Sequence, residues 1–138
     1  MGDILETASS VGSFKKFIEA IELAGLGKSL NNKTDFTLFA PTDRAFEKLP
    51  KRVYRRLMED KQKLREILKY HILPKKMMFT EVASMACENT LQGSQLCIDT
   101  SIGVSAVNTK IGNANIVVND IMCSNGVIHA IDNVLLPN

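Results

Sequence analysis

The chain has 138 residues, a size that suits one domain and leaves little room for two hydrophobic cores. Hydrophobic residues make up 45% and charged residues 23%, values that argue against an intrinsically disordered chain. No uninterrupted apolar run approaches the roughly 18 residues that a membrane helix requires. We therefore expect a single globular domain over residues 1–138.

The first part of the chain carries helical patterns. Residues 3–8 predict a short helix. Ser13 is a good N-cap for a second helix, and Gly25 stands where a glycine commonly ends one. Between them, four apolar residues recur at helical spacing: Phe14, Phe17, Ile18 and Ile21.

A short strand and further helices follow. Residues 36–39 form a β-favouring run, and Thr42 is placed to cap a helical turn after it. We expect helices at about residues 51–59 and 61–72. One face of the second carries Leu64, Ile67, Leu68 and His71.

The pattern changes after residue 86, where short β-favouring runs alternate with turn-forming residues. Candidate strands are residues 88–92, 95–100, 104–108, 114–121 and 126–135. Asn125-Gly126 is a strong turn signal before the last of them. Helices first and strands later predict an α+β fold with mostly antiparallel pairing.

The three cysteines are Cys87, Cys97 and Cys123. Their odd number leaves at least one of them unpaired within a monomer. One disulfide and three free thiols are both open, so the count does not set the redox compartment.

Two segments carry a recognisable signature. Residues 37–46 (TLFAPTDRAF) resemble the first conserved box of fasciclin domains, and residues 126–137 (GVIHAIDNVLLP) resemble the second. Between them, Tyr70-His71 is similar to the central Tyr-His pair of that family. The resemblance runs from about residue 3 to residue 137.

This resemblance implies the fasciclin fold, a wedge or sandwich of strands with a helical layer contributed mainly by the N-terminal half. It also implies a non-catalytic cell-adhesion or protein-interaction module. Its partner would be a receptor, an extracellular matrix component or a neighbouring domain, and its location secreted, cell-surface or periplasmic. Residues 1–20 lack the basic start and apolar core of a signal peptide, so for an exported chain we expect that the leader has been removed.

The first candidate partner-binding sites are Tyr70 and His71. The resemblance implies a role for this pair in receptor binding. His71, however, lies on the apolar face of its predicted helix, which favours a buried neutral ring with a hydrogen-bond partner. We interpret the pair mainly as structural.

The second candidate comprises Asn119, Asp120, Ile121 and Met122, just before the Asn125-Gly126 turn. It resembles a segment to which receptor recognition is assigned in adhesive animal domains. An exposed Asp120 carboxylate suits a receptor's divalent ion, because hard cations prefer oxygen ligands. The alternative is a strand end with Ile121 in the core and Asp120 in solvent.

The third candidate is a basic stretch. Residues 47–69 contain nine basic and four acidic side chains, whereas the whole chain has a net charge of +2. Four of these cations could hold sulfated glycans or anionic lipids: Arg52, Arg55, Arg56 and Lys63. The alternative is a solvated helical face. Nucleic-acid binding is not expected, because the acidic residues interrupt the run and stacking aromatics are scarce.

Enzymatic motifs of fixed spacing, such as GxSxG and HExxH, do not occur in the sequence. Cys123 and His129 leave a Cys–His system as a remote alternative. The two histidines, His71 and His129, show no usual zinc-ligand spacing. We therefore expect no catalysis, no metal and no cofactor. Asn32 begins an N-x-S/T glycan acceptor.

Overall fold

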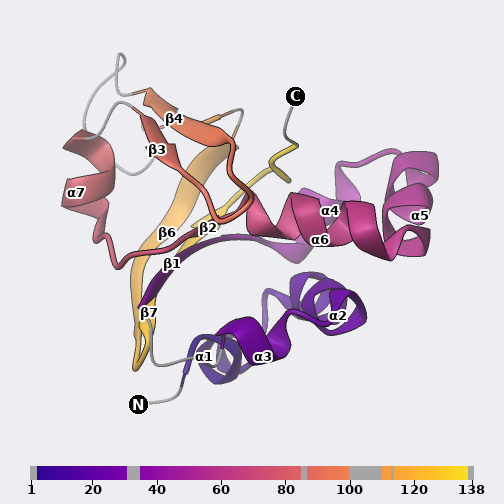
Figure 1. Ribbon diagram of the computed structural model, residues 1–138, viewed down its shortest axis with the longest axis horizontal. Coiled ribbons are helices and arrows are strands. Elements are labelled where there is room, and N and C mark those ends of the chain that lie inside the picture. Colours follow the sequence, from indigo (N-terminus) through magenta and orange to yellow (C-terminus); the bar gives the residue numbers. More distant parts are fainter. Residues whose placement is uncertain (1–2, 31–34, 85–86, 100–109, 113, 137–138) are drawn as a thin grey trace.

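A computed structural model of the chain describes residues 3–30, 35–84, 87–99, 110–112 and 114–136 (Figure 1). The helices in these residues are α1 (Ile4–Val11), α2 (Lys15–Ala24), α3 (Gly27–Leu30), α4 (Asp43–Glu47), α5 (Lys51–Glu59), α6 (Lys61–Lys69) and α7 (Phe79–Ser84). The strands are β1 (Phe36–Pro41), β2 (Ile72–Leu73), β3 (Cys87–Asn89), β4 (Gln95–Asp99), β5 (Lys110–Ile111), β6 (Ala114–Cys123) and β7 (Gly126–Ile131).

The strands join in the order β2-β1-β7-β6-β5-β4-β3. The β1–β7 pair is parallel, with Leu38 opposite Ile128 and Phe39 opposite His129. The other pairs in the described part of the sheet are antiparallel. The two sequence boxes thus lie side by side at the centre of the molecule, and the expected α+β class with mostly antiparallel pairing is confirmed.

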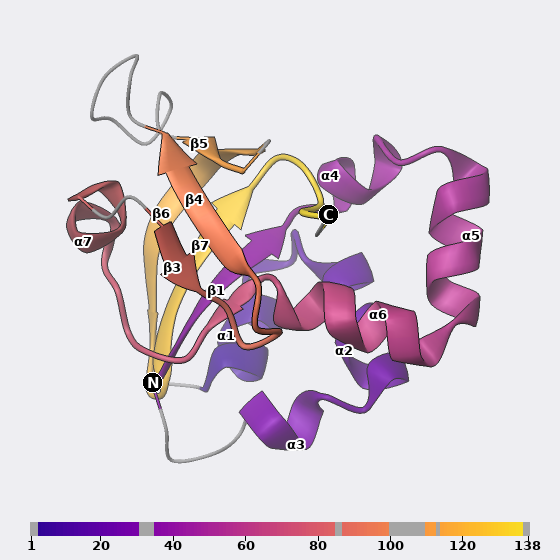
Figure 2. The ribbon, with the colours of Figure 1, turned by 45° about the horizontal axis from the view of Figure 1, so that its top comes forward.

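Both faces of β1 and β7 are buried, which explains why these two strands are apolar almost throughout. Leu38 and Ile128 point to one face and pack with the helices. Phe39 and Ile131 point to the other face and pack with Leu96 of β4. The sheet therefore curls over itself, and β3 and β4 lie across the long central strands (Figure 2).

Helices α1 to α6 form the layer on the first face, as expected for the N-terminal half (Figures 1 and 2). The predicted apolar face of α6 is buried at Leu64, Ile67 and Leu68. Helix α2 ends at Gly25, whose φ of 73° lies in the left-handed region that glycine adopts at low cost.

Several predicted boundaries were wrong. Ser13 does not cap α2. Instead, the Asp43 carboxylate accepts a hydrogen bond from Lys16 N at 2.8 Å, and Ser13 O accepts one from Asp43 N at 2.9 Å. The helix expected to reach residue 72 ends at Lys69, because Ile72 and Leu73 pair with β1.

Further differences concern the strands and two short helices. The last strand ends at Ile131 rather than at residue 135, and β6 extends to Cys123 rather than ending at residue 121. Helices α3 and α7 were not predicted. The strand expected at residues 104–108 lies outside the described residues.

Candidate partner-binding sites

Residues 119–122, called the 119–122 segment below, lie at an irregularity in β6. The pairing of β6 with β7 shifts register between Val118 and Ile121. Within that shift, Asp120 has a φ of 54°. Among the described residues other than glycine, it is the one with a positive φ. Asp and Asn tolerate this left-handed conformation better than other non-glycine residues. At Asp120 the irregularity interrupts the regular alternation of side chains between the two faces of the strand.

Asp120 is fixed by two hydrogen bonds. Its Oδ1 accepts from Phe79 N, at the start of α7, at 2.8 Å. Its backbone N–H donates to His129 Nδ1 at 3.2 Å. The Asp120 side chain is 35% exposed. The carboxylate is therefore partly exposed, and one of its oxygens satisfies the first backbone donor of α7.

His129 lies beneath this segment and is fully buried. Its Nδ1 accepts from Asp120 N, so Nε2 carries the hydrogen and donates to Met77 O at 2.9 Å. The ring stacks on Phe39 at a centroid distance of 5.7 Å. Burial lowers the pKa of His129. The neutral ring thus connects the 119–122 segment to the chain that leads into α7.

The other members of the segment differ in exposure. Asn119 is half-buried, Ile121 is half-buried against the helix-side core, and Met122 is 38% exposed. On the same strand, Val117 and Val118 are 52% and 51% exposed. The segment therefore combines a carboxylate, an amide and exposed apolar surface.

Tyr70 and His71 lie where α6 meets the sheet. His71 is fully buried, donates from Nδ1 to Ile67 O at 2.8 Å and accepts at Nε2 from Leu135 N at 2.9 Å. Burial lowers its pKa to about 4. Tyr70 is half-buried and donates to Gln95 O at 3.2 Å. The expected neutral structural histidine is confirmed, and it ties the C-terminal segment to α6.

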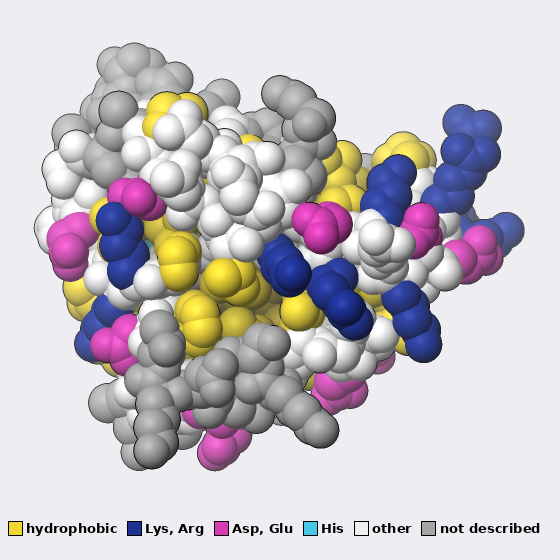
Figure 3. All heavy atoms as spheres, viewed as in Figure 1, with side chains coloured by type: hydrophobic (Ala, Val, Ile, Leu, Met, Phe, Trp, Pro, Cys, Tyr) yellow, Lys and Arg dark blue, Asp and Glu magenta, His cyan; other side chains and the backbone are white. Residues whose placement is uncertain are grey.

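The basic candidates occupy α5 and the start of α6. Arg52, Arg55, Arg56 and Lys63 are all exposed. None of the four forms an ion pair within the described residues. Lys and Arg side chains gather at this end of the molecule in Figure 3, on the side where Figure 1 places α5 and α6.

The cysteines fall into two environments. Cys87 and Cys97 are exposed and form a disulfide between β3 and β4. Cys123 is a buried free thiol, and burial raises its pKa to about 11. Within the described ranges, no group of three His, Cys, Asp or Glu side chains is arranged to hold a metal ion. Asn32 lies outside these ranges.

In the part of the chain that the structure describes, no helix combines the length and apolar character needed to cross a bilayer.

Sequence reasoning missed the role of Asn125 beyond its turn. The buried Asn125 side chain accepts from Ile4 N at 2.8 Å and donates to Leu30 O. Its backbone carbonyl accepts from Phe36 N at 3.0 Å. One residue thus joins α1, α3 and β1. An amide next to a glycine was the available signal, but nothing in the sequence identifies partners so distant in the chain.

Three comparisons place this geometry among known proteins. The model of the fasciclin domain family matches residues 12–137. The chain is 35% identical to an uncharacterized protein of Synechocystis sp., covering 99% of this chain and 98% of that protein. It is 37% identical to human periostin and 31% identical to pig transforming growth factor-beta-induced protein ig-h3, in both cases over 99% of this chain.

The chain spans only 16% of periostin and 20% of ig-h3. Among solved structures, a FAS1 domain pair from the insect cell adhesion molecule fasciclin I matches with a TM-score of 0.80 at 19% identity. That match covers 99% of this chain and 51% of the other, and it shows a common fold.

Proposed function

The chain belongs to the fasciclin-domain family, and from that premise we propose that it is a non-catalytic adhesion and protein-interaction module that acts outside the cytoplasm. One solved structure with the same fold comes from an insect cell adhesion molecule, which supports an adhesive role. The partner is a protein receptor or an extracellular matrix component. It contacts the 119–122 segment.

The observation that carries this proposal is the fixed conformation of Asp120. Phe79 N donates to the Asp120 carboxylate and Asp120 N donates to His129 Nδ1, so both the side chain and the backbone of the residue are held. A segment that is already ordered loses little conformational entropy when a partner binds. No hydrogen bond to Oδ2 of Asp120 is found within the described residues, so this oxygen can complete the coordination of a divalent ion on the partner.

The disulfide supports a location outside the cytoplasm. Cys87 and Cys97 are exposed, and disulfides form and persist mainly in oxidising compartments. We place the protein in a secreted, cell-surface or periplasmic setting on this ground.

The state of the nucleophilic side chains supports a non-catalytic role. Both ring nitrogens of His71 and His129 are engaged in internal hydrogen bonds. The raised pKa of Cys123 keeps its thiol protonated at neutral pH, whereas a nucleophilic cysteine must act as the thiolate. The Cys–His alternative therefore lacks both an activated thiol and a free base.

The test compares attachment of cells and of matrix proteins to immobilised wild-type domain and to Asp120→Asn. The Asn side chain keeps an acceptor for Phe79 N and tolerates the positive φ, but it removes the negative charge. Glu22→Gln is the matched control, because Glu22 is an exposed carboxylate on α2. We expect Asp120→Asn to lose attachment while its melting temperature is unchanged. Attachment equal to that of Glu22→Gln would remove the role assigned to Asp120.

A further inference from the structure

Helices α5 and α6 enclose a groove that is separate from the 119–122 segment. The groove has a volume of about 370 Å³ and also takes in Leu136 from the C-terminal segment. Leu57 and Ile67 form its floor and are only 4% and 5% exposed. Val53 and Leu136 form its walls and are 37% and 47% exposed. An apolar hollow with exposed apolar walls is typical of a binding groove.

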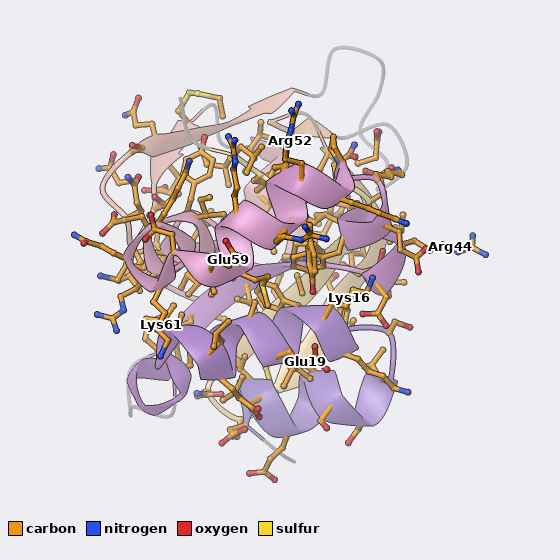
Figure 4. The ribbon with its side chains drawn as sticks, turned by 90° about the vertical axis from the view of Figure 1, so that its right-hand side faces the viewer. Lys16, Glu19, Arg44, Arg52, Glu59 and Lys61 are labelled. Atoms are coloured by element: carbon orange, nitrogen blue, oxygen red, sulfur yellow. A yellow bond between two sulfur atoms is a disulfide. The ribbon has the colours of Figure 1, made fainter. Side chains whose placement is uncertain are left out.

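Helix α5, which forms one side of this groove, has few contacts with the rest of the protein. Leu57 is the buried residue of α5, and the helix lies at the periphery of the molecule in Figure 2. Figure 4 looks onto α5 from outside, with Arg52 near its start and Glu59 near its end. The outward side of α5 is thus open to a partner.

The rim of the groove carries more positive than negative charge. Arg56 and Lys63 stand on its rim, where Glu66 is the acidic residue, and Arg52 lies one helical turn before Arg56. None of these three cations has an ion-pair partner in the described part of the chain. Helix α5 also begins with Lys51 and Arg52 and has no side-chain cap, although the positive end of the helix dipole disfavours cations there. An anionic partner would relieve this charge.

We propose that the α5–α6 groove binds an acidic segment of another protein, which inserts an apolar side chain between Val53 and Leu136 and places carboxylates against Arg52, Arg56 and Lys63. The concave apolar floor favours a peptide over a flat membrane surface. It also favours a peptide over a sulfated glycan, which would use the cations and leave the apolar walls uncovered. The groove volume lies at the low end of the ~300–1,000 Å³ of small-ligand pockets, which suits one or two anchoring side chains. This surface is additional to the proposed contact at the 119–122 segment.

The test selects a displayed library of random peptides of about 12 residues on the immobilised wild-type domain and measures the affinity of the enriched peptides for four double variants. Arg56→Glu with Lys63→Glu reverses the charge of the rim. Lys15→Glu with Lys76→Glu is its matched control, because both lysines are exposed, lie outside α5 and α6 and give the same net charge. Val53→Ser with Leu136→Ser removes the apolar walls, and Leu91→Ser with Val11→Ser is the matched control at exposed sites elsewhere.

The proposal predicts enriched peptides that contain acidic residues beside an apolar one. Their affinity falls about tenfold or more in each groove variant and stays within about twofold in each control. All these positions are exposed, so the variants should melt as the wild type does. Enriched peptides without acidic residues, or peptides insensitive to the groove variants, would overturn the proposal.

Two further probes distinguish other partners. Heparin and phosphatidylserine vesicles are tested on the same variants. Suppose that no peptide is selected, and that the domain retains one of these probes through Arg56 and Lys63 but not through Val53 and Leu136. The partner would then be a glycan or a lipid surface and not a peptide. Loss of attachment in Asp120→Asn bears on the 119–122 segment alone, so the two proposals fail separately.

Discussion

At the scale of single residues, His71 shows how burial makes the fold depend on pH. Both of its ring nitrogens are satisfied only in the neutral form, because Nε2 accepts from Leu135 N and Nδ1 donates to Ile67 O. Its pKa is lowered to about 4 from an ordinary 6.5. Above about pH 6.5 neither the folded nor the unfolded chain protonates this ring, so its contribution to stability is complete.

As the pH falls from about 6.5 towards 4, the unfolded chain takes up a proton that the folded chain excludes, and the free energy of unfolding decreases. At pH 4 this decrease in the free energy of unfolding is about 3 kcal/mol. Denaturant unfolding at several pH values measures it, and NMR titration of the ring assigns it. A His71 ring that titrates near its ordinary pKa in the folded protein would contradict this prediction.

Gly126 has no room for a side chain, because the backbone of Phe36 lies against it. Its φ is 153°, and a Cβ placed on it would lie 1.9 Å from Phe36 O, at the start of the β1–β7 pair. We expect Gly126→Ala to lower the free energy of unfolding by about 3 kcal/mol or more, because the two strands must separate.

The control for this substitution is Gly93→Ala. Gly93 also has a positive φ, of 109°, but a Cβ there meets nothing within 4 Å. Its cost should be the backbone strain alone, about 1 kcal/mol. Equal melting temperatures for the two variants would show that the collision with Phe36 is not the cause.

At the scale of elements, α7 depends on Asp120. This short helix has little buried surface of its own, with Val82 as its buried residue, and its first donor, Phe79 N, bonds to Asp120 Oδ1. Asp120→Ala should destabilise the start of α7 by about 1 kcal/mol, as loss of a cap does. Faster amide exchange in α7 is the expected signal. Asp120→Asn should leave exchange unchanged, and equal acceleration in both variants would contradict the capping role.

The helices and the central strands could be predicted because their patterns are local. Helical spacing identified α2 and α6, and the Asn125-Gly126 turn located the start of β7. The strand β2 has only two residues, too few for a recognisable pattern. Because these residues pair with β1, the helix ends at Lys69 and does not continue as the sequence pattern predicts. Ser13 failed as a cap because Asp43, distant in the chain, supplies the acceptor.

The sequence named the candidate residues 119–122 but could not give their geometry. The motif located Asp120, yet the register shift beside it and its bonds to Phe79 and His129 depend on which strands pair. The groove between α5 and α6 was missed for the same reason. The sequence indicated basic helices, but the apolar walls come from Val53 and the distant Leu136.

At the scale of the whole molecule, the Cys87–Cys97 disulfide links the edge strand β3 to its neighbour β4. The bridge spans a sequence separation of 10, and chain entropy alone predicts about 3 kcal/mol for a loop of this size. Cys87→Ala with Cys97→Ala should therefore lower the denaturant midpoint, as should a reducing agent on the wild type. Cys123 is buried and should not respond. An unchanged midpoint under reduction would show that the bridge adds nothing to global stability.

We propose that the fixed Asp120 carboxylate of this fasciclin domain makes an adhesive contact. The most direct measurement is attachment of cells to immobilised domain with Mg²⁺ and Mn²⁺ present and after their chelation, for wild type and Asp120→Asn. We predict that the wild type supports attachment only with the divalent ions and that Asp120→Asn stays at background in both conditions. Attachment that persists without the ions and is equal for the two proteins would contradict the claim.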